Sequence, residues 1–238
     1  MKEIPKSMID HLYINGASFA KDDNMIDQAV PHFADHVAKH YGWQLTNAAD
    51  SACNRRIIRR TIKDSQEFDS NTLVVVGLTI LSRTEMNVYD LWDRTDPDMI
   101  REDFFQMIRH NSPDSIYRNY RDAWFKNYSE YGEFVNLATD VLMLTGYLQS
   151  RGIPYLIYTY ESLLWTPELV GPLEKLPVVQ ALSRDARVLN LLNDNLVSHL
   201  GPGNWYYDGE TTGHLHAQGH VHAGEVLIEL INSTYKCN

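Results

Sequence analysis

The sequence has few cysteines and no long apolar run. Its two cysteines, Cys53 and Cys237, do not make a disulfide framework, so we expect a reducing, cytoplasmic compartment. No apolar run approaches the roughly 20 residues that a membrane-spanning helix needs. Residues 1–16 place charges and a proline before the first apolar stretch, which is unlike a secretory signal. We therefore expect no membrane partner and no secretory leader.

Basic residues are also scarce. The chain has 21 lysines and arginines against 31 acidic residues, which gives a formal net charge of −10 over 238 residues. Because binding to a phosphate backbone needs clustered positive charge, we expect no nucleic-acid partner. One basic cluster has the spacing of the solvated face of a helix, and it consists of Arg55, Arg56, Arg59, Arg60 and Lys63.

Short apolar runs alternate with helical periodicities along the chain. The patterns predict strands at 12–14, 43–47, 72–77 and 155–159, and helices at 25–41, 55–63, 132–150 and 220–231. The β-branched run at 72–77 is typical of a central parallel strand that is buried on both faces. This alternation predicts a three-layer α/β/α sandwich around a parallel sheet, formed by a single domain over residues 1–238.

Two segments interrupt the alternation. Residues 83–133 are rich in aromatic side chains, and we interpret them as a helical insertion beside the sheet whose rings either pack internally or line a substrate site. Residues 161–207 contain four prolines, which predicts loops with one helix near 179–199. In the last predicted helix we expect four residues to point inward: Val221, Val226, Leu227 and Leu230.

The first candidate for chemistry is Ser18. It follows the apolar strand 12–14 through a Gly-Ala-Ser turn and precedes a predicted helix. Such a turn exposes a hydroxyl beside backbone N–H groups that receive an anion, at the sheet edge where α/β proteins bind ligands. The alternative is a structural helix cap.

A histidine-rich segment near the C-terminus is the second candidate. His214, His216, His220 and His222 fall within nine residues. They form either a metal site or a single catalytic histidine ahead of the last helix. Because the sequence identifies no further ligand, we expect no metal and no cofactor, and the metal site stays as an alternative.

Four short motifs occur in an order that resembles the SGNH (GDSL-like) hydrolase family, particularly its divergent bacteriophage-type members. The motifs are Gly16-Ala17-Ser18-Phe19, Ser51-Ala52-Cys53-Asn54, Gly77-Leu78-Thr79-Ile80 and His214 to His220. The resemblance covers almost the whole chain and implies a flavodoxin-like sandwich. If the source is a phage, it also implies a location in the host cell cytoplasm.

The resemblance also implies roles for individual residues. Ser18 matches the nucleophile and His214 its general base, acting on a small or carbohydrate-linked ester. The groups expected to bind the oxyanion are the N–H groups of Ser18 and Ser51, the Thr79 hydroxyl and the Asn54 amide. Arg83 either pairs with Glu85 or binds an anionic substrate group.

Three positions depart from the family pattern. Ala17 and Thr211 stand where the family has aspartates, and Thr79 stands where it has asparagine. His214 therefore lacks its expected carboxylate, although Asp208 is nearby in sequence. Two alternatives follow: a catalytically degenerate binding protein, or a metal-dependent hydrolase that uses the histidines. Cys53 is either a buried, inert thiol or, if its thiolate is stabilised, a reactive group. The sequence does not predict an oligomeric state.

Overall fold

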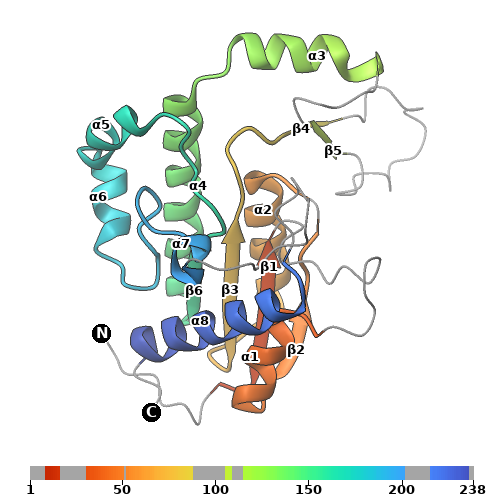
Figure 1. Ribbon diagram of the computed structural model, residues 1–238, viewed down its shortest axis with the longest axis vertical. Coiled ribbons are helices and arrows are strands. Elements are labelled where there is room, and N and C mark those ends of the chain that lie inside the picture. The colour runs from red at the N-terminus through yellow and green to blue at the C-terminus, as the bar shows by residue number, and fades with distance from the viewer. Residues whose placement is uncertain are drawn as a thin grey trace.

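A computed structural model describes residues 9–16, 31–50, 52–87, 105–108, 115–201 and 215–235, with residues 86–87, 105–108 and 115–118 described through the backbone alone. Helices lie on both faces of a parallel sheet (Figure 1). This arrangement confirms the predicted α/β sandwich.

The central sheet has the strand order β2-β1-β3-β6, with every neighbouring pair parallel. Its strands are β1 (His11–Gly16), β2 (Gln44–Asn47), β3 (Thr72–Leu78) and β6 (Tyr155–Thr159). Val188 extends the sheet beyond β6 through a parallel bridge to Ile157. The resulting spatial order is that of a flavodoxin-like, doubly wound sheet. All of β3 is buried, as its β-branched run predicts.

The helix α1 (Phe33–Tyr41) begins later than predicted. Pro31 lacks the N–H that a helix interior requires. His32 is the N-cap, because its ring accepts the Ala34 N–H at 3.2 Å and its own N–H donates to Asp35 at 2.9 Å. Residues 31–32 belong to the predicted helix 25–41 but are not helical, so the prediction is wrong there. Residues 17–30 lie outside the described part of the chain. Gly42, at φ 74°, ends the helix as predicted.

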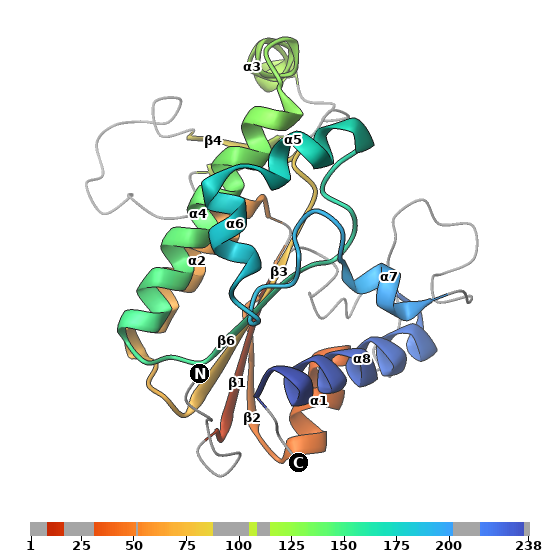
Figure 2. The same cartoon turned by 90° about the vertical axis from the view of Figure 1, so that its left-hand side faces the viewer.

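The helices α2 (Asn54–Asp64) and α4 (Glu130–Ser150) cover the face opposite α1 (Figure 2). The amide of Asn15 in β1 fixes α2 by donating to the carbonyl of Ile57 and to the hydroxyl of Thr61. The sequence predicts that the basic residues of α2 face solvent, but two of them make specific contacts. Arg59 pairs with Glu85 and Arg60 donates to a backbone carbonyl, because the residues after β2 and β3 pack against this helix.

The aromatic-rich insertion is only partly helical. It contains α3 (Ser115–Lys126), but β4 (Thr84–Asn87) and β5 (Phe105–Ile108) form an antiparallel pair that the sequence analysis did not predict. Between α3 and α4, the ring centroids of Trp124 and Tyr128 are 5.1 Å apart. The rings at this junction therefore pack on one another.

The segment after β6 folds into short helices instead of one. These are η7 (Pro167–Leu169), α5 (Val170–Glu174), α6 (Pro177–Ser183) and α7 (Leu196–Leu200). The predicted helix at 179–199 is wrong because the chain leaves α6 to pair with β6. Ile157 donates its N–H to Arg187 at 2.8 Å and accepts that of Leu189 at 2.9 Å.

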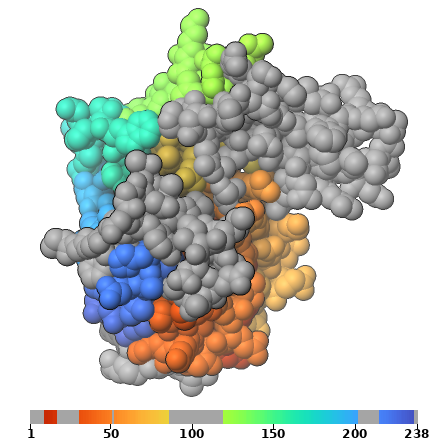
Figure 3. Space-filling view, turned by 45° about the vertical axis from the view of Figure 1, so that its right-hand side comes forward, coloured from red at the N-terminus to blue at the C-terminus, as the bar shows by residue number. Residues whose placement is uncertain are grey.

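The last helix, α8 (Ala217–Tyr235), packs against α1 (Figure 3). A Cβ at Gly224 would lie 2.8 Å from the Cβ of His36, so this glycine permits the close approach of the two helices. Val226 and Leu227 are buried as predicted and Leu230 is half-buried, whereas Val221 is 41% exposed and its predicted inward position is wrong. Among the described residues, no helix is long and apolar enough to cross a membrane.

Candidate functional site

The order of the strands identifies a crevice at the carboxyl ends of β1 and β3. From this pair the chain winds outward in both directions, to β2 on one side and to β6 on the other. Ligands of doubly wound sheets bind at such a switch point. Gly16, the last residue of β1, pairs with Gly77 near the end of β3. A Cβ at Gly77 would lie 2.9 Å from the Tyr158 hydroxyl, so the packing at this end requires a small residue.

The segment between β2 and α2 reaches the same edge. Asp50 donates its N–H to the Gly16 carbonyl at 3.1 Å. The amide of Asn54 then pairs with the backbone of Thr79, donating to the carbonyl and accepting the N–H, both at 2.8 Å. The end of β1, the start of α2 and the turn after β3 therefore meet at one place.

Asn54 and Thr79 have different roles in this arrangement. Because both ends of the Asn54 amide are engaged by the Thr79 backbone, the Asn54 side chain clamps the turn after β3 and is not aimed at a ligand. The Thr79 side chain is 0% exposed, and its hydroxyl finds no hydrogen-bond partner among the described residues. A buried hydroxyl without a partner costs about 1–3 kcal/mol. The Thr79 hydroxyl is therefore a buried polar group at the carboxyl edge whose hydrogen-bond partner the described residues do not supply.

Three predicted site residues lie outside the part of the chain that the structure describes: Ser18, Ser51 and His214. The nearest described residues in sequence are Gly16, Ala52 and Leu215, and all three are buried.

The other three histidines of the C-terminal segment serve α8. His216 is its cap, because the ring accepts the Gly219 N–H at 3.2 Å. The ring of His220 stacks on Phe33 at 6.0 Å, and His222 bonds to the Leu200 carbonyl at 3.1 Å. His216 and His222 therefore make specific structural contacts, to the first turn of α8 and to the end of α7. Within the described ranges, no group of three or more His, Cys, Asp and Glu side chains is arranged to hold a metal ion.

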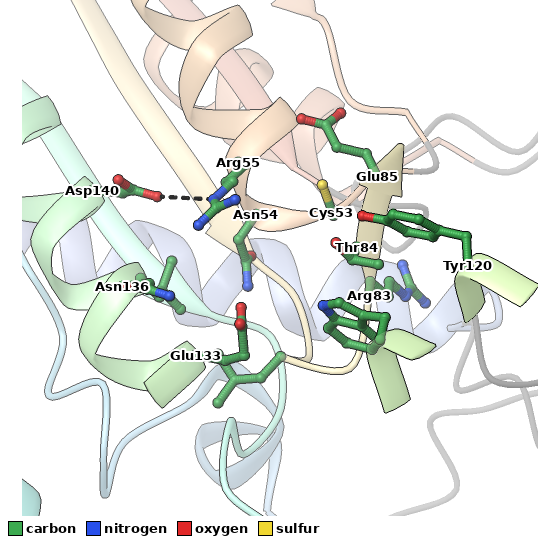
Figure 4. A pocket seen from close by; sticks show the side chains of 13 residues that line it. Cys53, Asn54, Arg55, Arg83, Thr84, Glu85, Tyr120, Glu133, Asn136 and Asp140 are labelled. Carbon is green, nitrogen blue, oxygen red and sulfur yellow. Dashed lines mark ion pairs between the residues drawn. The ribbon is translucent and has the colours of Figure 1, made fainter. Parts of the chain in front are cut away.

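A pocket of about 190 Å³ lies beside the crevice (Figure 4). The start of α2, the turn after β3 with β4, α3 and the first half of α4 each contribute to its wall. Its principal side chains are Cys53, Asn54, Arg55, Arg83, Glu85, Tyr120, Trp124, Glu133, Asn136 and Asp140. The predicted residues Asn54 and Arg83 therefore share a pocket.

The charges around this pocket are paired differently from the prediction. Glu85 accepts two bonds from Arg59, at 2.6 and 3.2 Å, so the carboxylate predicted to pair with Arg83 is held by α2. The two residues follow β3 on one short segment, and Glu85 instead meets the neighbouring α2. Burial raises the pKa of the Glu161 carboxyl, and the positive charge of Arg83 opposes this rise. The charge of Arg83 therefore lowers the pKa of Glu161, a residue that follows β6 at the same edge.

Cys53 lines the pocket but is not activated. Its side chain is 2% exposed, and burial, followed by the negative charge of Glu85, raises the pKa of the thiol to about 11. At neutral pH the side chain is therefore a thiol and not a thiolate, which contradicts the alternative of a reactive cysteine.

The sequence analysis missed several polar groups at this end of the molecule. Glu161 lies two residues after a predicted strand, a signal that places it near the sheet edge. His199 and Asp194 form a 2.6 Å imidazole–carboxylate pair, and Thr159 donates to the Asp194 carbonyl at 3.1 Å. No sequence signal identifies this pair, because it depends on how the turn before α7 folds back.

Comparisons with known proteins bear on the fold. No protein-family model matches the sequence, and no curated protein matches it. Among solved structures, the chain is similar to YxiM from Bacillus subtilis, with a TM-score of 0.50 and 13% identity over 94% of this chain and 56% of that one. It is also similar to a Desulfitobacterium hafniense DCB-2 protein assigned to the lipolytic G-D-S-L family, with a TM-score of 0.49 and 10% identity over 93% of this chain and 99% of that one.

These observations define a doubly wound α/β protein in which the end of β1, the start of α2 and the turn after β3 meet at the carboxyl edge of the sheet. The likeness to YxiM is a likeness of fold, consistent with the parallel sheet between helices.

Proposed function

We propose that this chain is a serine hydrolase of the SGNH type that cleaves a small or carbohydrate-linked ester through Ser18 and His214. One observation carries the proposal: the end of β1, the segment before α2 and the turn after β3 converge at the switch point of the sheet. Ser18 follows Gly16 by two residues and Ser51 precedes Ala52. The resemblance to bacteriophage-type members, with a cytoplasmic location, belongs to the same proposal.

The proposed reaction has two steps. His214 takes the proton of the Ser18 hydroxyl while its oxygen attacks the ester carbonyl, and the alcohol leaves with that proton. Water, deprotonated by His214, then attacks the acyl-enzyme, and the acid leaves as Ser18 recovers its proton. The Thr79 hydroxyl and the N–H groups of Ser18 and Ser51 donate to the oxyanion. The observation that supports Thr79 in this role is that its hydroxyl has no hydrogen-bond partner among the described residues.

Thr211 stands where the family has an aspartate, and we expect this replacement to slow ester hydrolysis. Loss of the carboxylate that orients the catalytic histidine lowers kcat by about four orders of magnitude in a serine protease. We therefore expect a slow esterase, unless Asp208 supplies the missing carboxylate.

Hydrolysis of p-nitrophenyl acetate tests the proposal, with wild type, Ser18→Ala and His214→Ala each assayed with and without EDTA. We expect the rate to fall to background in both variants and to be indifferent to EDTA. A serine-directed fluorophosphonate should label wild type and not Ser18→Ala. Loss of the rate on adding EDTA would instead favour a metal-dependent hydrolase. Equal background rates with no labelling would favour a degenerate binding protein.

A further inference from the structure

The pocket beside the crevice has a lining that the proposed chemistry does not use. Tyr120 and Trp124 of α3 contribute aromatic rings, whereas Glu133, Asn136 and Asp140 of α4 contribute carboxylates and an amide (Figure 4). The pocket adjoins the crevice through Asn54, which lines it and also clamps Thr79. A molecule in this pocket would therefore lie next to the groups proposed to act on an ester.

The charges near the pocket compensate one another. Arg59 makes two bonds to Glu85, the shorter of 2.6 Å, and Arg55 lies 3.8 Å from Asp140. The third arginine, Arg83, acts on Glu161. The lining itself has two arginines, Arg55 and Arg83, against the three carboxylates of Glu85, Glu133 and Asp140, so the pocket has no excess positive charge for a phosphate or carboxylate ligand. The chain's net charge of −10 opposes an anionic ligand as well.

The remaining groups match an uncharged ligand that has an apolar face and a polar rim. Aromatic rings present flat apolar faces. Amides and carboxylates on Asn136, Glu133 and Asp140 accept or donate hydrogen bonds to neighbouring hydroxyls. A pyranose ring has both surfaces, with C–H groups on its faces and hydroxyls around its edge. A fatty acyl chain would remove water from these polar groups without replacing their hydrogen bonds.

The size of the pocket limits how much of a ligand it holds. Its volume is about 190 Å³, below the roughly 300–1,000 Å³ of pockets that hold drug-sized ligands. We propose that this pocket binds one uncharged sugar residue, which is the alcohol part of the ester. The assignment of the sugar to the alcohol part rests on the proposed function, whereas binding of the sugar does not.

Saturation-transfer NMR with the full chain tests this inference. The probes are the methyl β-pyranosides of glucose, xylose and N-acetylglucosamine, with methyl glucuronide as a charged sugar comparison and hexanoate as a charged comparison with an apolar chain. We expect transfer to the uncharged pyranosides, with weaker transfer to the two comparison ligands. Trp124→Ala should weaken binding about tenfold, as expected for the loss of one aromatic contact.

Two further variants keep the test interpretable. Trp165→Ala is the matched control, because Trp165 is 61% exposed and is not among the residues that line this pocket. It should bind as wild type does. Asn136→Leu removes an exposed amide of similar size, so it should weaken binding without the loss of packing that Trp124→Ala causes. Thermal unfolding of each variant verifies that it is folded.

Several results would overturn the inference: no transfer to any pyranoside, preference for the glucuronide or hexanoate, or equal weakening in Trp124→Ala and Trp165→Ala. Pyranoside binding that persists in Ser18→Ala, in a protein whose wild type hydrolyses no ester, would support the sugar site and contradict the proposed function. Ester hydrolysis that depends on Ser18, without any pyranoside binding, would contradict the sugar site alone.

Discussion

The two ends of the parallel sheet differ in how completely their polar groups are satisfied. At the amino end of β6, the Tyr155 hydroxyl donates to Asp185, and Arg187 adds bonds to Asp185 of 2.7 and 3.0 Å. Tyr235 closes this network from α8, donating to the Tyr155 carbonyl at 2.5 Å and accepting its N–H at 2.8 Å. At the carboxyl end, the Thr79 hydroxyl is buried without a partner in the described structure, and burial raises the pKa of Glu161.

We interpret the paired groups at the amino end as stabilising the fold and the unpaired Thr79 hydroxyl as a group of the functional site. Buried polar groups are nearly always hydrogen-bonded, so an exception requires an explanation. We infer that the amino end stabilises the sheet and that the carboxyl end contains the site. Mutations at the two ends should therefore change different quantities.

Thr79→Val should give the largest effect at the carboxyl end. Valine keeps the shape of threonine but removes the donor proposed for the oxyanion, so we expect kcat for p-nitrophenyl acetate to fall about a hundredfold. The free energy of unfolding should stay the same or rise slightly, because an unsatisfied buried hydroxyl is lost. Steady-state kinetics and urea unfolding measure the two quantities. A less stable variant with a normal rate would reverse the assignment of Thr79.

Asp185→Asn, at the amino end, should lower the stability of the protein and leave its esterase rate unchanged. The change leaves Arg187 without its partner, so we expect a loss of about 2 kcal/mol in the free energy of unfolding, with kcat unchanged. Urea unfolding and the esterase assay measure this. A fall in kcat without a loss of stability would contradict the structural role of this network.

The same carboxylate predicts a dependence of stability on pH. Burial by itself raises the pKa of Asp185, but the hydrogen bonds from Arg187 and Tyr155 outweigh it and lower the pKa below its ordinary value. Its contribution to stability is therefore complete above the unfolded-state pKa of about 3.9 and is lost as pH falls through the lower folded-state value. Unfolding free energies of wild type should fall in this acidic range, and those of Asp185→Asn should fall less. Equal slopes would exclude Asp185 as the source.

Cys53→Ala should have the smallest effect. The thiol lines the pocket, but with its pKa raised to about 11 it is protonated at neutral pH, so the esterase rate should stay within about twofold of wild type. Iodoacetamide should modify Cys53 slowly at pH 7 compared with an exposed thiol. Loss of activity in this variant would restore the reactive cysteine as a candidate nucleophile.

Local sequence patterns determined the main elements of the fold. The β-branched run of β3 identified the central strand, Gly42 marked the end of α1, and the alternation of strands and helices indicated the parallel sheet. These features depend on residues that are neighbours in sequence, so periodicity and turn chemistry are sufficient to predict them. Described parts of the first three motifs meet at the carboxyl edge, whereas His214 of the fourth lies outside the described residues.

Tertiary structure alone decided which side chains pair. Glu85 bonds to Arg59 of α2, 26 residues away, and Asn54 clamps the backbone of Thr79. The strands β4 and β5 each depend on a partner outside their own four residues, and no local pattern encodes that partner. Each of these contacts joins segments that are distant in sequence. The packing of α2, α3 and α4 around the sheet therefore created the pocket, although each of its residues was visible in the sequence.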